Sequence, residues 1–322
     1  MSSDLDAALQ KSRDKRVLSI QSHVVHGYAG NKCSVFPLQM NGFEVDFINS
    51  VQFSNHAGNV FYKSLPTRYS HVKGQKLTDA ELSELYEGLK LNDLLHYTHI
   101  LTGYCGNITF LQRIADVVKD IKQRNPQAIF VCDPVMGDNG HYYCPPDLMP
   151  VYRDTIVPLA DVLTPNAFEL GELTGMQVDT EESCLQAVNK IHALGVRIVV
   201  VTSGIEKAQK EGHLNCYTSI REPNGDTVRT RFVFPRLDGA FVGTGDAFTS
   251  LLLVRLDDCN GNVAEAVGQV LGSMQALIRR TSEFAQNQVD SNSRAMCELR
   301  LIESRKDLLV PQQKFQGERI EI

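Results

Sequence analysis

The 322-residue sequence lacks several features that mark large classes of protein. No run approaches the roughly eighteen apolar residues of a transmembrane helix, so no such helix is expected. Residues 1–16 mix both charges and contain no apolar core, which argues against a signal or transit peptide. The eight cysteines include no C-x-x-C pair, which argues against a zinc ribbon or thioredoxin-type site. We therefore expect a cytoplasmic protein with reduced cysteines.

An excess of basic charge is also absent. Thirty-two Lys and Arg residues face thirty-eight Asp and Glu residues, for a formal charge of −6. A dedicated nucleic-acid-binding protein needs clustered basic charge to neutralise phosphates, so no nucleic acid is expected as a partner. Hydrophobic residues make up 43% of the chain and charged residues 22%, which is typical of a globular protein with a sizeable core.

Short apolar runs alternate with amphipathic segments from residue 16 onward. The predicted strands cover residues 17–22, 43–50, 98–103, 128–134, 161–165, 197–203, 213–220 and 227–234. The predicted helices cover residues 30–40, 78–89, 108–124, 147–156, 166–174, 180–194, 245–257, 262–281 and 295–306, with a loop at 57–76. Strands that are apolar on both faces and alternate with helices indicate an α/β fold with a mostly parallel sheet.

One domain accounts for this pattern. We expect it to span residues 16–306, with a flexible N-terminal tail at 1–15 and a C-terminal tail at 307–322. The segments 213–220 and 227–234 flank a Pro-Asn-Gly-Asp turn and predict a short antiparallel addition to the sheet.

Small polar side chains stand at the ends of five predicted strands. Ligands of open parallel sheets bind beyond the carboxyl ends of the strands, so these positions are the first candidates for a site. The five strand ends are Ser19-Ile20-Gln21-Ser22, Thr102-Gly103-Tyr104, Asp133 through Asp138, Thr164-Pro165-Asn166 and Thr202-Ser203-Gly204.

The sequence Gly243-Thr244-Gly245-Asp246 precedes a long apolar helix. Glycines at a helix N-terminus let backbone N–H groups converge on an anion such as a phosphate. A carboxylate in the first helical turn also has a purely structural interpretation, because it interacts favourably with the helix dipole. No G-x-x-x-x-G-K-[ST] segment occurs, which excludes a Walker nucleotide site.

Together with the strand ends, this turn fits a site for phosphoryl transfer. Such a site needs amides for the anion, carboxylates for a metal, and a carboxylate near the attacking hydroxyl. Asp133, Asp138 and Glu169 offer the hard oxygen ligands that Mg²⁺ prefers. The alternatives are a strand-ending turn for Asp133 and a solvated helix face for Glu169.

Seven segments, in order along residues 16–306, resemble the pyridoxal kinase family of the ribokinase superfamily. They are VLSIQSHVVHGYAGN (17–31), NSVQFSNHAG (49–58), LTGY (101–104), VCDPVMGD (131–138), TPNAFEL (164–170), VTS (201–203) and FVGTGDAF (241–248). The resemblance implies a three-layer ribokinase-like α/β fold, with a mostly parallel central sheet flanked by helices and a few antiparallel strands.

The resemblance also implies roles for single residues. Asp246 matches the base that accepts the proton of the substrate's 5′-hydroxymethyl group, and amides of Gly243, Thr244 and Gly245 match the anion hole. A helix N-terminus lowers the pKa of a carboxyl group, so we expect Asp246 to be a weak base. On the substrate side, the matching or neighbouring positions are Ser22, Val51, Phe53, Ala57 and Tyr104.

The nucleotide and cation positions follow from the same resemblance. ATP contacts match Asp138, Asn166, Thr202, Ser203 and Thr244, together with Gly245 and the adenine-side residues Leu237, Asp238 and Gly239. A site for K⁺ or Na⁺ matches Asp133, Thr164 and Thr202. Asp133 and Glu169 are placed to order Mg²⁺, or another divalent cation, through water.

Three features depart from the family pattern. Ala57 stands where many members have a threonine whose hydroxyl contacts the substrate, a loss worth about 0.5–1.5 kcal/mol of binding. Residues 60–72 resemble an insertion, and residues 139–145 form a shorter lid than that of mammalian members.

The resemblance implies an ATP-dependent kinase of pyridoxal, pyridoxine or pyridoxamine that acts as a homodimer. A hydroxymethylpyrimidine kinase of the same superfamily is the alternative enzyme, because it shares the phosphate-binding machinery. A non-catalytic pyridoxal-binding protein is the third possibility, although the chain retains both the glycines and Asp246.

Overall fold

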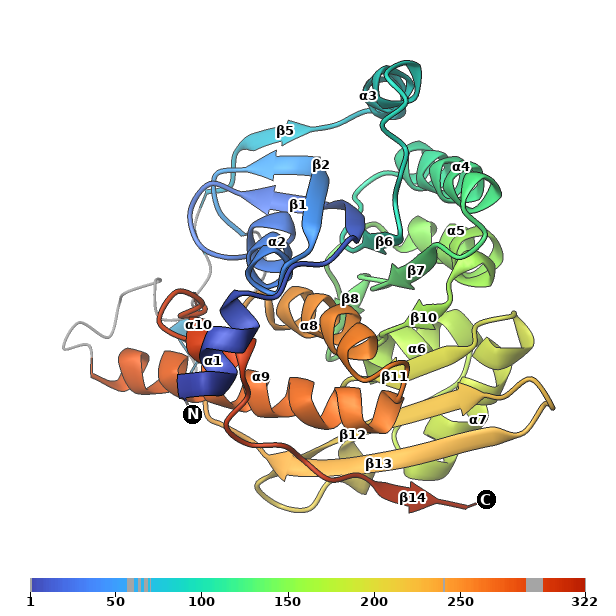
Figure 1. Cartoon of the computed structure of the whole chain (residues 1–322). Coiled ribbons are helices and arrows are strands. Elements are labelled where there is room, and N and C mark those ends of the chain that lie inside the picture. Colours follow the sequence, from blue (N-terminus) through green and yellow to red (C-terminus); the bar gives the residue numbers. More distant parts are fainter. Residues whose placement is uncertain are drawn as a thin grey trace.

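A computed structural model describes residues 2–56, 71–239, 241–287 and 298–321, together with Tyr69 and the short strands at 61–62 and 65–66. Ten of the described strands form one sheet in the order β14-β13-β12-β11-β10-β7-β6-β1-β2-β5 (Figure 1). The strands are β1 (Arg16–Val24), β2 (Glu44–Phe53), β5 (Gly74–Lys76), β6 (His99–Thr102), β7 (Ile129–Cys132), β10 (Val162–Leu163), β11 (Ile198–Val201), β12 (His213–Arg221), β13 (Thr227–Pro235) and β14 (Glu318–Ile320).

The middle of the sheet is parallel, as the apolar runs predicted. β2, β1, β6, β7, β10 and β11 pair in parallel, whereas β5 joins one edge and β12–β14 extend the other edge antiparallel. Two small hairpins lie outside this sheet. They are β3 (Phe61–Tyr62) with β4 (Leu65–Pro66), and β8 (Gly137–Asp138) with β9 (His141–Tyr142).

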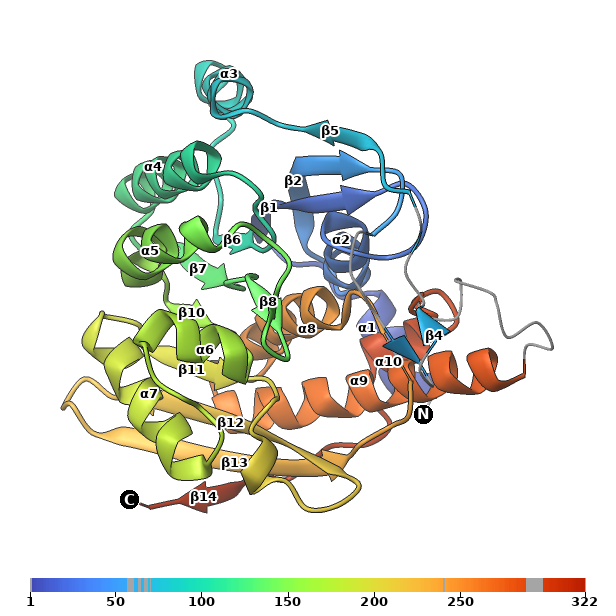
Figure 2. The ribbon, with the colours of Figure 1, turned by 180° about the vertical axis from the view of Figure 1, so that it is seen from behind.

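Helices cover both faces and complete the expected three layers. Figure 1 shows α8 and α9 in front of the sheet, and Figure 2 shows α4, α6 and α7 on the opposite face. The described helices are α1 (Ser2–Leu9), α2 (Asn31–Met40), α3 (Asp79–Leu91), α4 (Ile108–Arg124), α5 (Met149–Val151), α6 (Ala167–Thr174), α7 (Glu181–Ala193), α8 (Thr244–Asp258), α9 (Val263–Gln286) and α10 (Arg305–Leu309). None of the helices in the described part of the chain is long and apolar enough to cross a membrane.

Local sequence signals explain where several helices begin. Thr78 caps α3 by accepting the Glu81 N–H at 3.2 Å, while the Glu81 carboxylate accepts the Thr78 N–H at 2.8 Å, which confirms the capping box seen in the sequence. Asn107 caps α4 through hydrogen bonds from the N–H groups of Thr109 and Phe110.

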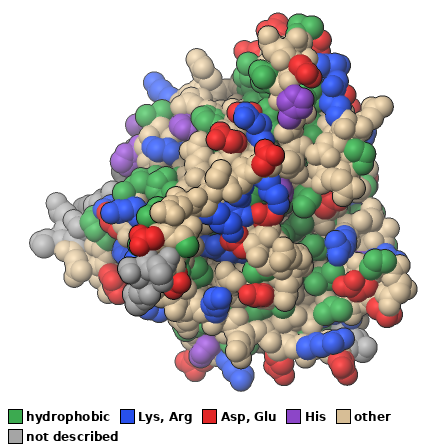
Figure 3. All heavy atoms as spheres, viewed as in Figure 1, with side chains coloured by type: hydrophobic (Ala, Val, Ile, Leu, Met, Phe, Trp, Pro, Cys, Tyr) green, Lys and Arg blue, Asp and Glu red, His purple; other side chains and the backbone are tan. Residues whose placement is uncertain are grey.

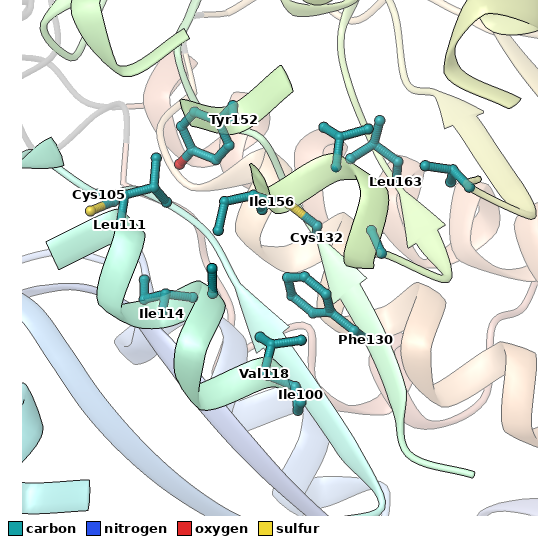
Figure 4. Packing of buried hydrophobic residues seen from close by; sticks show 14 of the residues in the cluster. Ile100, Cys105, Leu111, Ile114, Val118, Phe130, Cys132, Tyr152, Ile156 and Leu163 are labelled. Carbon is teal, nitrogen blue, oxygen red and sulfur yellow. The ribbon is translucent and has the colours of Figure 1, made fainter. Parts of the chain in front are cut away.

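The core beneath α4 shows how the layers are held together. Ile100 and Phe130 from the strands pack with Val118 of α4 and with Tyr152 and Ile156 of the following irregular segment (Figure 4). All five side chains are almost fully buried. Each such side chain stabilises the fold by about 1.5–3 kcal/mol through removal of its apolar surface from water.

Both expected tails form ordered structure. The Arg13 side chain is 4% exposed, donates to the Asn41 carbonyl at 2.7 Å and pairs with Asp257 and Asp258 at the end of α8. Helix α1 packs against α10 (Figure 1). At the other end of the chain, β14 pairs with β13 and adds a strand to the sheet. Within the described residues, the segments 2–15 and 307–321 therefore pack on the domain instead of extending from it.

Two further expectations were wrong for described residues. The predicted loop at 57–76 contains the short strands β3, β4 and β5, and β5 pairs with β2. The predicted helix at 295–306 is replaced by turns at 301–304, with helix α10 beginning only at Arg305. Helical spacing of apolar residues does not determine a helix where the backbone is held by tertiary contacts.

The surface in Figure 3 carries both signs of charge. Lys and Arg side chains lie among Asp and Glu side chains over this face, and neither sign dominates it. The arrangement agrees with the small formal charge of −6.

Candidate active site

The site lies at the carboxyl edge of the parallel strands, where the start of α8 meets the ends of β1, β7 and β10. Gly243 stands directly before α8 with a left-handed φ of 85°. A Cβ atom at Gly243 would lie 2.3 Å from the carbonyl oxygen of Tyr28, so only glycine fits. The turn therefore brings the first amides of α8 close to the loop that follows β1.

Asp246 occupies the first turn of α8 and is held by a backbone donor. Its Oδ2 accepts the N–H of Gly30 at 2.7 Å, and its carbonyl accepts the Ser34 hydroxyl at 3.1 Å. Gly30 is the N-cap of α2, so the carboxylate lies at the amino ends of two helices.

The pKa of Asp246 differs from the sequence expectation. Burial raises the pKa of this carboxyl group above its ordinary value, and the hydrogen bond from Gly30 opposes the increase. The helix terminus was expected to make Asp246 a weaker base than usual, and this was wrong because desolvation outweighs the stabilising N–H. A higher pKa makes the carboxylate better suited to accept a proton.

Gly30 also brings the end of β1 against Asp246. Its φ is +57°, and a Cβ atom there would lie 1.9 Å from the Ser22 carbonyl oxygen and 2.4 Å from the Ser22 hydroxyl. Ser22 pairs with Val51 after a shift in register between Gln21 and Ser22. Such irregularities reorient side chains at strand ends, and here Gly30 lies close to both Ser22 and Asp246.

A buried polar network lies beneath this arrangement, and the sequence reading did not identify it. Ser19 donates to Asn31 Oδ1 at 2.7 Å, Gln21 donates to Ser19 at 2.9 Å, and Asn31 donates to the Ile48 carbonyl at 2.9 Å. The network joins β1, β2 and α2. The signal in the sequence was the pair of polar residues Ser19 and Gln21 on alternate positions of an apolar strand.

The expected substrate-side residues differ in exposure. Tyr104 follows β6, is half-buried, and its carbonyl accepts the Ser50 hydroxyl at 2.8 Å. Phe53 is half-buried at the end of β2, whereas Val51 is 2% exposed and therefore packs within the core. Ala57 lies outside the described residues.

Glu169 is buried, so its interpretation as part of a solvated helix face was wrong. Its carboxylate accepts the N–H groups of Met136 and Asn166, each at 3.0 Å, and Asn166 accepts the Glu169 N–H at 2.9 Å. These bonds form the capping box of α6. Burial nevertheless raises the pKa of Glu169 to about 8, because desolvation exceeds the effect of its backbone donors.

Asp133 follows β7 and faces the start of α8. A Cβ atom at Gly245 would lie 3.3 Å from Asp133 Oδ2, and the Thr249 hydroxyl bonds both the Asp133 carboxylate and, at 3.0 Å, the Thr164 hydroxyl. Burial raises the pKa of Asp133 well above its usual value, and the nearby Glu169 carboxylate adds to the shift.

Among the described residues, the carboxylates Asp133, Glu169 and Asp246 have no basic side chain as a partner. In the ranges that the structure covers, no Lys, Arg or His nitrogen lies within 4.0 Å of any of them. Across the same residues, no three acidic, His or Cys side chains are close enough to chelate a metal ion by themselves. This donor set fits a hydrated cation that completes its shell with water and substrate oxygens.

The expected nucleotide-side residues gather around the start of α6. The Asn166 amide donates to the Gly137 carbonyl at 2.7 Å, beside Asp138, whose Oδ1 accepts the Asn139 N–H at 2.8 Å. The Thr202 N–H donates to the Pro165 carbonyl, and the Ser203 carbonyl accepts the Ala167 N–H. The ends of β7, β10 and β11 are thereby joined in one place.

Residues 139–145, which were expected to form a short lid, contain strand β9 of the β8–β9 hairpin, and β8 packs on α6. Tyr142 lies edge-on to Phe168 with ring centroids 5.1 Å apart, and its hydroxyl bonds Glu172. Residues 237–239, which were expected on the adenine side, form a separate segment in which the Asp238 carbonyl accepts the Ser282 hydroxyl of α9 at 2.7 Å.

Comparisons with known proteins agree with this geometry. The model of the pfkB family carbohydrate kinases matches residues 1–288. A Caenorhabditis elegans relative is 72% identical over 310 residues, which cover 96% of this chain and 95% of that protein. The pyridoxal kinase of Sus scrofa is 43% identical over 311 residues, which cover 93% of this chain and 94% of that enzyme.

Solved structures show the same relationship. The structure of pyridoxal kinase from Leishmania donovani in complex with ADP and pyridoxamine matches 96% of this chain and 100% of its own, with a TM-score of 0.86 and 37% identity. The chain therefore belongs to the pyridoxal kinase family of the ribokinase superfamily.

Proposed function

We propose that this chain transfers the γ-phosphoryl group of ATP to the 5′-hydroxymethyl group of pyridoxal, pyridoxine or pyridoxamine. The observation that carries the proposal is Asp246, a carboxylate at the start of α8 that forms no ion pair with any described residue and accepts the Gly30 N–H at 2.7 Å. The relatives support the choice of substrate, because the Leishmania kinase is described in complex with ADP and pyridoxamine.

The transfer step uses Asp246 as the base. The vitamer hydroxyl oxygen attacks the γ-phosphorus, its proton passes to Asp246, and the bond to the bridging oxygen breaks to release ADP. Amides of Gly243, Thr244 and Gly245 stabilise the charge that develops on the transferred group. The raised pKa of Asp246 supports this role, because a general base is most effective when its pKa approaches the working pH.

The vitamer ring binds between the ends of β1, β2 and β6. Ser22 offers a hydroxyl to the pyridine ring, and the half-buried rings of Tyr104 and Phe53 offer flat apolar surfaces for stacking. Val51 supports this wall from within the core. Ala57 provides no hydroxyl, so we expect weaker vitamer binding than in members with threonine there.

ATP binds across the ends of β7, β10 and β11, where Asp138, Asn166, Thr202, Ser203 and Thr244 supply polar groups. Residues 237–239 flank the adenine.

Cations fit beside the phosphates, because Asp133 and Glu169 are buried and neither they nor Asp246 pair with a basic side chain within the described residues. Asp133 and Glu169 would hold Mg²⁺ through water, and Asp133, Thr164 and Thr202 would hold K⁺ or Na⁺. Cations held there would neutralise phosphate charge.

The experiment that tests the function measures ADP production with Mg²⁺, K⁺ and ATP in the presence of pyridoxal or hydroxymethylpyrimidine. Turnover with pyridoxal that exceeds turnover with the pyrimidine at least tenfold supports the proposal. Preference for the pyrimidine would assign the chain to the alternative kinase. Binding of pyridoxal without ADP release would make it a binding protein. Sedimentation of the same sample tests the proposed homodimer, and cell fractionation tests the proposed cytoplasmic location.

A further inference from the structure

Glu298 lies far from the motifs in sequence, yet its carboxylate is buried beside the active site. The residue is 7% exposed. Its Oε2 accepts the Tyr28 N–H at 2.9 Å, and its Oε1 accepts the Tyr69 hydroxyl at 3.1 Å. The His56 ring lies 3.5 Å from the same Oε1. One carboxylate thus contacts three separate segments of the chain.

The Glu298 carboxylate is tightly packed against the loop that follows β1. Gly27 packs directly on the carboxylate, since a Cβ atom there would lie 2.0 Å from Glu298 Oε2. Tyr28, held by Glu298 through its N–H, presses its own carbonyl against Gly243. Two residues further on, Gly30 donates its N–H to Asp246.

The backbone of Glu298 contacts the segment that leads into α8. It forms a parallel β-bridge with Val242, the residue directly before Gly243. The side chain holds Tyr28 while the backbone holds Val242, so Glu298 fixes the distance between the segments that carry Gly30 and Asp246.

The remaining contacts reach the substrate side. His56 lies three residues after β2, and its ring packs edge-on against Tyr69 with centroids 5.0 Å apart. Both rings lie against the Glu298 carboxylate. The residue therefore links the polypeptide next to the proposed vitamer site with the turn that carries the base.

We propose that Glu298 is a positioning residue for phosphoryl transfer. It aligns the Asp246 carboxylate with the vitamer hydroxyl by locking the 27–30 loop against the 242–246 turn, and it holds Tyr69 and His56 at the vitamer side. This inference rests on the proposed kinase function. In this proposal Glu298 does not contact the reacting atoms. Its contacts in the described structure include no residue of α6 or β11, where the nucleotide is proposed to bind.

The test compares Glu298→Ala and Glu298→Gln with Glu303→Gln, a matched control. Glu303 belongs to the same C-terminal segment, but its side chain is 44% exposed and pairs with Arg300. Steady-state kinetics give kcat and the KM values for pyridoxal and ATP separately. Loss of a hydrogen bond to a buried charge predicts that the alanine variant lowers kcat/KM for pyridoxal at least about tenfold, while the KM for ATP stays within about twofold.

The glutamine variant separates positioning from general stability. Its amide oxygen still accepts the Tyr28 N–H, so we expect it to recover most of the activity that the alanine variant loses. The Glu303→Gln control is expected to match the unmodified chain. Equal increases in both KM values, no recovery by glutamine, or an alanine variant that matches the control would each overturn the proposal. If the alanine variant does not fold, Tyr69→Phe replaces it, because it removes the hydroxyl that donates to Glu298 Oε1. An increased pyridoxal KM at unchanged ATP KM then supports the proposal, and values equal to the control overturn it.

Hydrogen exchange supplies a readout that does not depend on turnover. The Glu298→Ala variant should exchange the amides of residues 28–30 at least about tenfold faster, because Tyr28 loses its acceptor. Unchanged exchange in this peptide would overturn the proposed link. Activity of the unmodified chain tests the proposed function, so the two failures are distinguishable.

Discussion

Replacement of Gly30 by alanine tests whether the close packing of Gly30 against the end of β1 holds Asp246 in place. Gly30 has a φ of +57°, and a Cβ atom would lie 1.9 Å from the Ser22 carbonyl oxygen. Because the obstacle is backbone, it cannot rotate away. Gly212→Ala is a matched control, since its φ is +72° and no atom lies within 4 Å of the added Cβ.

Both substitutions place an alanine at a positive φ, but only Gly30→Ala also forces the added Cβ atom against the backbone of β1. Left-handed backbone costs an L-residue about 1–2 kcal/mol, so the control should lose about that amount of unfolding free energy. Gly30→Ala adds the overpacking of β1, worth about 1–3 kcal/mol more. Displacement of the Gly30 N–H from Asp246 removes a hydrogen bond to a charged group, which predicts a kcat about 10- to 100-fold lower.

Urea unfolding and steady-state kinetics measure these effects. We expect Gly30→Ala to lose more stability than Gly212→Ala and to lose activity in addition, while the control retains its kcat. The apparent pKa of the acid limb of the pH–rate profile should also increase, because Gly30→Ala displaces the N–H that lowers the pKa of Asp246. Equal stability of the two variants, together with an unchanged kcat for Gly30→Ala, would refute the argument.

Three further predictions concern charge. Asp133→Asn should raise the free energy of unfolding by about 1 kcal/mol in cation-free buffer, because it removes a buried carboxylate that has no ion-pair partner among the described residues. The same substitution should raise the cation concentration at which turnover is half-maximal, and an unchanged cation dependence would contradict this role. Burial lowers the pKa of His99 to about 4, so the ring stays neutral in the folded protein near neutral pH. The unfolding free energy should therefore be constant above about pH 6.5 and fall by up to about 3 kcal/mol toward pH 4. His99→Gln should abolish this fall when unfolding is measured as a function of pH. Arg13→Ala should lower the unfolding free energy by about 3–5 kcal/mol with little change in kcat, whereas a loose tail would give no change in urea unfolding.

The sequence was sufficient for the parallel part of the fold because its signals are local. The apolar runs at 17–22, 98–103 and 197–203 became β1, β6 and β11, and the capping box at Thr78 began α3. Fully apolar strands separated by helices leave few arrangements other than a covered parallel sheet.

The ends of the chain were not predictable in the same way. Arg13 is buried because Asp257 and Asp258 meet it at the end of α8, and β14 forms because β13 offers an unpaired edge. Such contacts join residues more than 80 positions apart, and nothing in the composition of residues 1–15 or 307–322 indicates them.

The candidate site was predicted as a set of positions but not as an electrostatic environment. The glycine turn and Asp246 stood out by sequence, but the acceptance of the Gly30 N–H and the burial of Glu169 depend on how α2 and α6 pack. Glu298 carried no local signal, since a single glutamate in a polar stretch is common.

The measurement that tests the central claim most directly is the turnover of Asp246→Asn with pyridoxal and ATP, alongside ADP binding to the same variant. Asparagine keeps an oxygen that accepts the Gly30 N–H but accepts no proton from the vitamer. The account predicts a kcat about 10²- to 10⁴-fold lower, with ADP affinity within about threefold of the unmodified chain. A kcat within about threefold of the unmodified chain would show that Asp246 is not the base.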